Sequence, residues 1–199
     1  MRGAAGIAVL LASSVIAAPS LTSAQDCPTA QSARNGFVVE RDQRSKTEVF
    51  VGSDSIVRTV MRSGGKTLLE TTQFEGLFQL DRIDTGHRTV LRPKTNLASL
   101  FPLKVGQTIR AEFDIEDPRR PGTAAIEFSV KKTDTLHIGP CQYRVYQMER
   151  RESRGESPLR FVNTDYYAPD LKLIIAKEYK YQDDRTRLIK FDRIYSIKR

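Results

Sequence analysis

The stretch TIRAEFDIE, residues 108–116, alternates apolar and charged side chains over its whole length. Successive side chains of a strand point to opposite faces of a sheet, so this alternation is typical of a strand with one buried and one solvated face. The apolar positions are Ile109, Ala111, Phe113 and Ile115, and the charged positions are Arg110, Glu112, Asp114 and Glu116. The stretch therefore predicts an antiparallel sheet that buries one of its two surfaces.

Segments with the same period of two lie on both sides of this strand and end at turn residues such as SGG (63–65) and DTGH (84–87). They include FVVERD (37–42), TEVFVG (47–52), SIVRTVMR (55–62), AAIEFSVKKTDTLHIG (124–139), QYRVYQMERRE (142–152) and LRFVNTDYYA (159–168). The pattern predicts a mainly β fold of about ten to twelve antiparallel strands in a single domain, residues 25–199. A sheet of that size must curve to hide its apolar face and its edges, which predicts a half-barrel or barrel and leaves a sandwich as an alternative.

One segment, KTNLASLFPLKVGQTI (94–109), breaks the strand pattern. Leu97, Leu100 and Phe101 fall at helical spacing, and Pro102 prevents the helix from continuing. We therefore expect a single helical turn at about residues 96–101.

The start of the chain has the three parts of a secretory signal. Arg2 precedes an apolar run without acidic residues, and Thr22 and Ala24 stand three and one positions before the expected cleavage site. Residues 1–24 are thus predicted to be a signal peptide. The apolar run is shorter than a membrane span of about 20 residues, and no later stretch approaches that length. We expect a periplasmic or secreted protein with no transmembrane segment in the mature chain.

The chain has two cysteines, Cys27 and Cys141. Export delivers them to an oxidising compartment, so we predict a disulfide between them, with two free thiols as the alternative. Neither cysteine belongs to a C-x-x-C pair, which argues against a redox or zinc site. Gln25 and Asp26 precede Cys27 where a lipoprotein signal carries small uncharged residues, which argues against a lipid anchor.

The chain is basic, with 32 Lys and Arg against 24 Asp and Glu, a formal charge of +8. Removing residues 1–24 takes away Arg2 alone, which leaves 31 basic and 24 acidic residues, a charge of +7. For an exported protein the expected counter-charges are anionic lipid head groups or acidic envelope polymers, and nucleic acid is not an expected partner. The charges are scattered along the chain, however, as on an ordinary solvated surface.

A late segment, DYYAPDLKLIIAKEYKY (165–181), concentrates four tyrosines around a proline turn. Pro169 suits the second position of a β-turn, so the segment predicts a hairpin. Aromatic residues are favoured in strands for packing alone, and a hairpin is enough to explain them. The candidate ligand-contacting residues are Tyr166, Tyr167, Tyr179 and Tyr181.

Two motifs carry a resemblance to other proteins. Phe-Pro-Leu-x-x-Gly (101–106) leads into a strand, and Tyr-x-x-Pro-x-Leu (166–171) leads into an apolar strand. In these motifs the chain resembles a family of exported bacterial β-domains without an assigned activity, whose fold is similar to the half-barrel of the lipoprotein-localisation carriers. The resemblance implies an envelope location and a curved sheet with an apolar concavity. It transfers no catalytic residue.

Candidates for chemistry are few. His87 and His137 lie fifty residues apart, and we interpret both as surface or strand-end residues. Glu112, Asp114 and Glu116 share a strand face, where neighbouring carboxylates could flank a glycosidic bond or hold calcium; Asp117 follows them directly. We predict no catalytic residue, no cofactor and no metal site.

These observations predict an exported envelope protein that is not an enzyme and that binds an apolar or amphiphilic envelope molecule, such as a lipid, or acts structurally. One alternative is a cell-wall or polysaccharide hydrolase that uses the strand carboxylates. The other is a basic interaction module for anionic envelope polymers. The identity of the ligand and the oligomeric state are left open by the sequence.

Overall fold

The computed structural model describes residues 26–42, 45–181 and 185–197, so the predicted signal peptide lies outside the described residues. All the strands of the described residues belong to one antiparallel sheet, and the only helical elements among them are two 3-10 turns. This confirms the mainly β prediction, with thirteen strands where ten to twelve were expected. None of the helical segments in these ranges has the length and apolar character needed to cross a bilayer.

The elements follow the expected segments closely. The strands are β1 (Phe37–Arg41), β2 (Ser45–Val51), β3 (Ile56–Ser63), β4 (Lys66–Phe74), β5 (Phe78–Asp84), β6 (His87–Pro93), β7 (Thr108–Glu116), β8 (Gly122–Ile138), β9 (Cys141–Arg154), β10 (Arg160–Ala168), β11 (Leu173–Lys180), β12 (Thr186–Lys190) and β13 (Arg193–Ser196). The 3-10 turns are η1 (Ser32–Asn35) and η2 (Leu97–Leu100). The second turn confirms the helical turn expected at 96–101.

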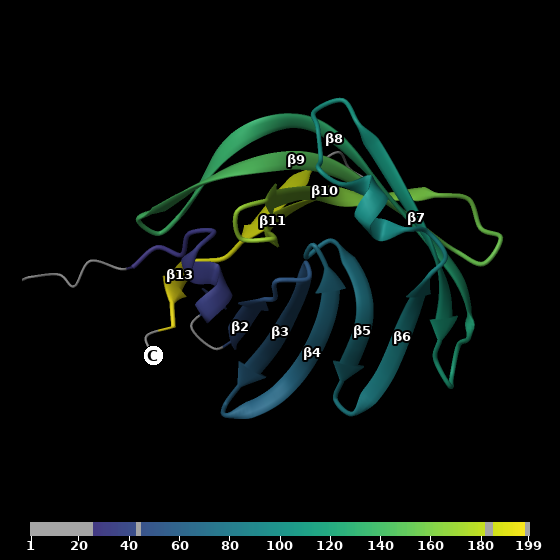
Figure 1. The fold of residues 1–199 in the computed structure, drawn as a ribbon, viewed down its shortest axis with the longest axis horizontal. Helices are drawn as coiled ribbons and strands as arrows, with labels where there is room; N and C mark the ends of the chain where they lie inside the picture. The colour runs from purple at the N-terminus through teal and green to yellow at the C-terminus, as the bar shows by residue number, and fades with distance from the viewer. Residues whose placement is uncertain (1–25, 43–44, 182–184, 198–199) are drawn as a thin grey trace, which may run out of the picture.

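Each strand from β1 to β11 pairs with the next one along the chain, and β13 pairs with β1. Figure 1 shows the resulting curve, with β2–β6 as one arc, β8–β11 as the opposite arc, and β7 between them. The two edge strands, β12 and β13, are connected by Phe191 and Asp192 alone. The Asp192 N–H donates to the Glu40 carbonyl oxygen over 2.8 Å, which fixes this connection against β1. Strand pairing therefore does not close the sheet, because its two edge strands are not paired with each other. The short connection between β12 and β13 nevertheless links the two edges.

The concave surface of the sheet holds a large apolar cluster. Strand β7 alternates exposed and buried residues without exception, as its sequence predicts. Its apolar residues pack with those of β5, β8 and β9 and with η2. The fully buried members include Phe78, Phe113, Phe128 and Met148. Burying such side chains removes apolar surface from water and is the main favourable contribution to folding.

The segment that contains η2 fills the interior of the curve. Leu97 and Leu103 are buried in the apolar cluster, and Phe101 packs against it. The Phe101 ring meets the Phe78 ring edge to face, with centroids 6.4 Å apart. Aromatic pairs favour this arrangement because the positive ring edge meets the negative ring face. The segment therefore acts as an internal plug, which leaves only part of the concavity open.

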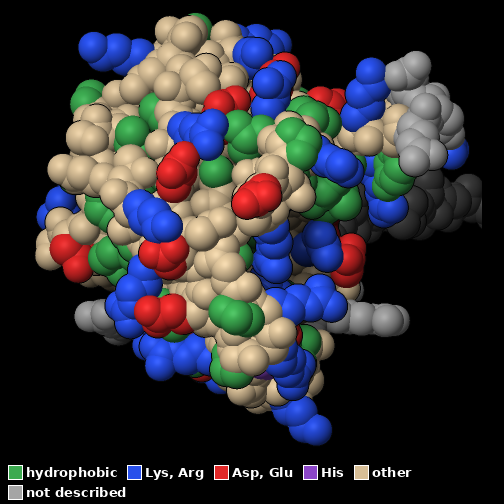
Figure 2. All heavy atoms as spheres, turned by 90° about the vertical axis from the view of Figure 1, so that its right-hand side faces the viewer, with side chains coloured by type: hydrophobic (Ala, Val, Ile, Leu, Met, Phe, Trp, Pro, Cys, Tyr) green, Lys and Arg blue, Asp and Glu red, His purple; other side chains and the backbone are tan. Residues whose placement is uncertain are grey.

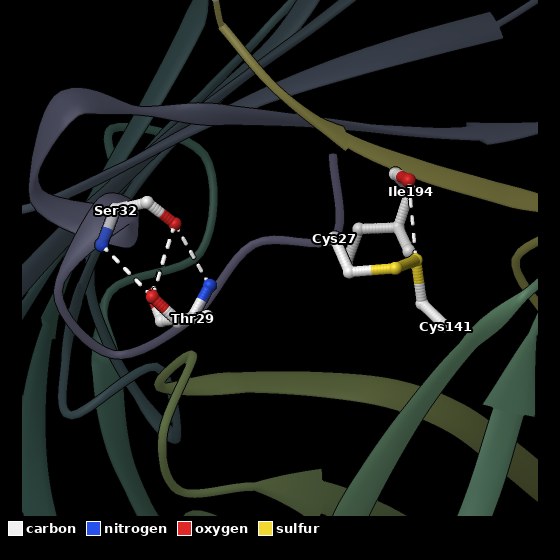
Figure 3. The surroundings of a disulfide bond; sticks show 5 residues. All are labelled: Cys27, Thr29, Ser32, Cys141 and Ile194. Carbon is white, nitrogen blue, oxygen red and sulfur yellow. Dashed lines mark hydrogen bonds between the residues drawn. A yellow bond between two sulfur atoms is a disulfide. The ribbon is translucent and has the colours of Figure 1, made fainter. Parts of the chain in front are cut away.

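A second apolar cluster lies where the N-terminal strands meet β9 and the β10–β11 turn. It includes Phe37, Val49, Cys141, Leu171 and Ile194. Cys27 and Cys141 form the predicted disulfide, with Cα atoms 5.5 Å apart (Figure 3). The bond attaches the N-terminal segment to the start of β9, next to β13. Cys141 Sγ lies 3.9 Å from the Ile194 carbonyl oxygen.

The β4–β5 turn, with Ser55 of the β2–β3 connection beside it, touches the end of β10 and the β10–β11 turn across the curve. We call this contact the clasp (Ser55, Glu75, Gly76, Tyr167 and Lys172). The Tyr167 hydroxyl donates to the Glu75 carbonyl oxygen over 2.8 Å. Lys172 Nζ donates to Glu75 Oε1 over 2.8 Å and to Ser55 Oγ over 3.0 Å. Gly76 comes so close to Lys172 that a Cβ atom there would lie 1.8 Å from the Lys172 carbonyl oxygen. The clasp thus joins the two arcs of the sheet.

Candidate functional site

A cavity of about 280 Å³ opens on the concave side, away from the clasp, and we call it the arginine cavity. Strands β5 to β9 supply its walls. It is lined by Gln79, Arg82, Thr89, Leu91, Ile115, Ala124, Ala125, Ile126, Arg150, Glu152, Ser153 and Arg154. Alternate residues of each strand point toward the concave side. The inward-pointing residues at this end of the strands include apolar side chains of the concave surface and charged side chains at its rim, and both kinds line the cavity.

The lining has two chemically distinct parts. Leu91, Ile115 and Ile126 are apolar, whereas the charged residues are three arginines and one glutamate. Arg82 Nη2 pairs with Asp84 Oδ2 at 2.6 Å. Arg154 is exposed at the rim, and the structure shows no ion pair for it within the described ranges. An apolar wall beneath a group of guanidinium ions is suited to an anion that carries an apolar substituent.

Arg150 lies at the inner end of the charged part. Its guanidinium carbon is 5.6 Å from the centre of the Phe128 ring, within cation–π distance. Nη2 pairs with Glu152 and Nη1 lies 3.9 Å from Asp165 Oδ2. Nε is buried and has no hydrogen-bond acceptor among the described residues. Arg150 is therefore fixed in place by several contacts and keeps one donor unused.

Behind Arg150 lies Asp165 on β10, which is 0% exposed. Asn163 Nδ2 donates to Asp165 Oδ1, and Lys177 Nζ lies 3.8 Å from the same oxygen. Oδ2 receives no hydrogen bond from the described part of the chain. Burial raises the pKa of the Asp165 carboxyl, although Lys177 and Arg150 oppose this effect. Burial likewise lowers the pKa of Lys177.

A second polar group lies at the rim, where Asp117 follows β7. The backbone N–H of Arg119 donates to Asp117 Oδ1 over 2.8 Å. The Thr89 hydroxyl donates to Oδ2 over 2.9 Å, and His87 Nε2 lies 3.1 Å from the same oxygen. These contacts, the Arg119 N–H foremost, hold the pKa of the Asp117 carboxyl well below its usual range.

Because its pKa is lowered in the folded protein, Asp117 is expected to stabilise the protein at neutral pH and to lose this contribution in acid. Its contribution is present above the ordinary pKa of 3.8 and is lost as the pH falls toward the lower folded-state pKa. We expect Asp117→Asn to destabilise the protein at pH 7, and the difference from wild type to shrink between pH 4 and pH 2. Urea unfolding across this range measures it. Asp114→Asn, which removes an exposed carboxylate paired with Lys94, is the control, and an undiminished difference at pH 2 would contradict the assignment.

The other acidic residues of this strand face solvent on the convex side. Glu112 pairs with Arg110 at 2.9 Å and Asp114 pairs with Lys94 at 2.7 Å, while Glu116 pairs with Arg92. None of the three lines the arginine cavity. His137 is exposed on β8, and its carbonyl oxygen accepts from Lys190 Nζ. Among the described residues, no cluster of three or more His, Cys, Asp or Glu could hold a metal ion.

The four candidate tyrosines are not brought together. Tyr167 is 2% exposed and lines a cavity of about 420 Å³ beside the clasp, with Phe101, Pro102 and Tyr146. Tyr166 packs against the second apolar cluster. Tyr179 lines a small cavity of about 120 Å³ between β11, β12 and Arg41, and Tyr181 is exposed. The hairpin is present, and ligand contact by these residues stays a prediction.

Sequence reasoning did not select Arg82, Arg150, Asp165 or Lys177. A signal for Asp165 was present, since alternation puts Asn163, Asp165 and Tyr167 on one face of β10 and Tyr167 belongs to the core. The pairing of Asp165 with Lys177 across β10 and β11 depends on the strand register. A bulge between Tyr166 and Tyr167 sets this register, and the sequence does not specify the position of a bulge.

The face of the molecule drawn in Figure 2 shows no continuous patch of a single charge. Basic and acidic side chains are interspersed there, and hydrophobic side chains occur in small groups between them. This agrees with the scattered charges of the sequence. The arginines of the cavity are distinguished by their position beside an apolar wall.

Comparison with known proteins gives little further information. No family model matches the chain, and no curated protein matches it. Among solved structures, the hypothetical lipoprotein YmcC from Escherichia coli (K12) is similar, with a TM-score of 0.45 and 11% sequence identity, covering 78% of this chain and 86% of that chain. A likeness of this degree carries no argument about function.

Proposed function

We propose that the protein is an exported, non-enzymatic domain that binds an amphiphilic molecule with an anionic group in the arginine cavity. The apolar part of the ligand lies against Leu91, Ile115 and Ile126. The anionic group meets Arg150 at the inner end of the charged part and Arg154 at the rim. The observation that carries this proposal is the meeting of an apolar wall and three arginines in one concave cavity.

The size of the cavity limits its occupant. Its volume of about 280 Å³ is just below the range of roughly 300–1,000 Å³ typical of small-molecule pockets. The plug formed by the η2 segment packs into the apolar cluster of the concave surface and leaves less room there for a ligand. The ligand is therefore a small amphiphile, or a larger one of which only the end enters the protein.

Two further features support an envelope location. The Cys27–Cys141 disulfide suits an oxidising compartment. The basic net charge of the chain suits the anionic head groups of envelope lipids. The periplasm or the cell exterior is thus the proposed location.

Calorimetric titration with 1-octanesulfonate tests the proposal, because this probe combines a permanent anion with a single alkyl chain. We expect saturable binding that is up to about tenfold tighter than that of 1-hexanesulfonate, because two more methylene groups become buried. Arg154→Gln should weaken the binding about fivefold through loss of one charge at the rim. Octyltrimethylammonium, which has the same chain and the opposite charge, should bind much more weakly.

Lys66→Gln is the matched control, since it removes one exposed positive charge at the start of β4, outside the cavity. It should leave the affinity unchanged. Equal binding of both octyl probes would show that the arginines do not select the ligand. Absence of binding for every chain length would reject the function proposed for this cavity.

A further inference from the structure

The carboxylate of Asp165 is buried directly behind one of the arginines that line the cavity. Asp165 does not line the cavity itself, whereas Arg150 does. The two side chains approach to 3.9 Å between Nη1 and Oδ2. This distance is beyond that of a normal hydrogen bond, so Asp165 influences Arg150 mainly through its charge.

The neighbours of Asp165 carry charges of both signs. From β9 it faces Arg150 and Glu152, and from β11 it faces Lys177. On its own strand Asn163 supplies the hydrogen bond to Oδ1. Lys177 also lines the small cavity between β11 and β12, where Arg41 and Lys190 are further basic residues. Two cations near 4 Å and one further carboxylate thus surround a group from which water is excluded.

We propose that Asp165 is a positioning residue that makes anion binding in the arginine cavity depend on its own protonation. When Asp165 is ionised, its negative charge offsets that of Arg150 and repels an incoming anion. When Asp165 is protonated, Glu152 is the one close counter-charge that Arg150 keeps among the described residues, and more of the positive field of Arg150 is available to the ligand. This inference rests on the function proposed above and adds its regulation.

The direction in which anion affinity changes with pH follows from the coupling between proton binding at Asp165 and anion binding in the cavity. Burial places the pKa of Asp165 above its ordinary value, so the proton is taken up at a milder pH than by an exposed aspartate. Anion affinity should therefore rise as the pH falls through this pKa. By reciprocity, a bound anion should raise the pKa of Asp165 further. At the short separations within the cluster, one charge changes the affinity on the order of tenfold.

The test is the affinity for 1-octanesulfonate between pH 8 and pH 4, a range in which this probe stays ionised. We expect wild type to bind about tenfold more tightly at the acidic end. Asp165→Asn should bind with nearly constant affinity, close to the acidic value of wild type. Glu152→Gln is the matched control because it removes the neighbouring carboxylate but keeps Asp165, and it should retain the pH dependence.

The outcomes separate the inference from the function on which it rests. If Asp165→Asn binds the probe with the pH dependence of wild type, Asp165 is not the linked group and the inference is wrong, while the cavity remains a binding site. If no protein binds the probe at any pH, the proposed function fails and the inference fails with it.

A second measurement covers the case in which Asp165→Asn does not fold. The carboxyl carbon of Asp165 can be followed by NMR in wild-type protein during a pH titration, with and without 1-octanesulfonate. The inference requires that the ligand move the midpoint of this titration to higher pH. An unchanged midpoint in the presence of bound ligand would overturn it.

Discussion

Replacing both cysteines by alanine (Cys27→Ala with Cys141→Ala) is expected to lower the free energy of unfolding by about 4–5 kcal/mol. The disulfide joins residues 114 positions apart, so it restricts the unfolded chain strongly. It also attaches a segment that contributes little apolar surface beyond Ala33. Since domains of this kind are stable by only about 5–15 kcal/mol, the loss is a large part of the total.

Urea unfolding of the double variant and of wild type, each with and without reductant, measures this effect. Reduced wild type should resemble the double variant, and reductant should not change the double variant. A difference below about 1 kcal/mol would show that the chain-entropy estimate does not apply here. Alanine is preferred to serine because Cys141 is buried among apolar residues, where an unpaired hydroxyl would add its own cost.

The second large effect is expected at the clasp, where Gly76→Ala should destabilise the protein by about 3–4 kcal/mol. Gly76 has a φ of +67°, which disfavours any other residue, and its added Cβ would lie 1.8 Å from the Lys172 carbonyl oxygen. Backbone atoms cannot move aside as the end of a side chain can. The two arcs of the sheet would have to separate at this contact, at the expense of the Tyr167 and Lys172 hydrogen bonds.

Gly86→Ala is the matched control, since Gly86 has a φ of +87° and a Cβ there would meet nothing within 4 Å. We expect Gly86→Ala to lower the free energy of unfolding only through backbone strain, by about 1–2 kcal/mol. The difference between the two variants, measured by thermal or urea unfolding, therefore isolates the close approach at the clasp. Equal losses would show that the clasp yields readily and does not hold the arcs together.

Much of the strand pattern of this chain was predictable because a period of two is typical of half-buried strands. Strand β7 shows this most directly, as its alternation in sequence reappears in its burial. The η2 turn was predictable from Pro102 and the helical spacing before it. The Cys27–Cys141 bond followed from the count of two cysteines and the expected export.

The candidate site was much less predictable, for a physical reason. The arginine cavity collects residues from five strands, and its composition depends on the register of each pair. Arg150 and Asn163 face one another only because a bulge lies between Phe161 and Asn163. Periodicity identifies which residues share a face of one strand, but it does not specify which residues meet across the sheet.

The pairing of β13 with β1 has a consequence for how the molecule is assembled. These strands lie at opposite ends of the chain, so β1 gains its second neighbour only when the last residues of the domain have been synthesised. Until then its outer N–H and C=O groups have no partner strand and can attract other chains. Complete pairing of β1 therefore requires residues as far along the chain as Ser196, and contacts so distant in sequence form slowly. Before β13 has paired, the exposed edge of β1 is therefore the part of the sheet where intermolecular association is most expected.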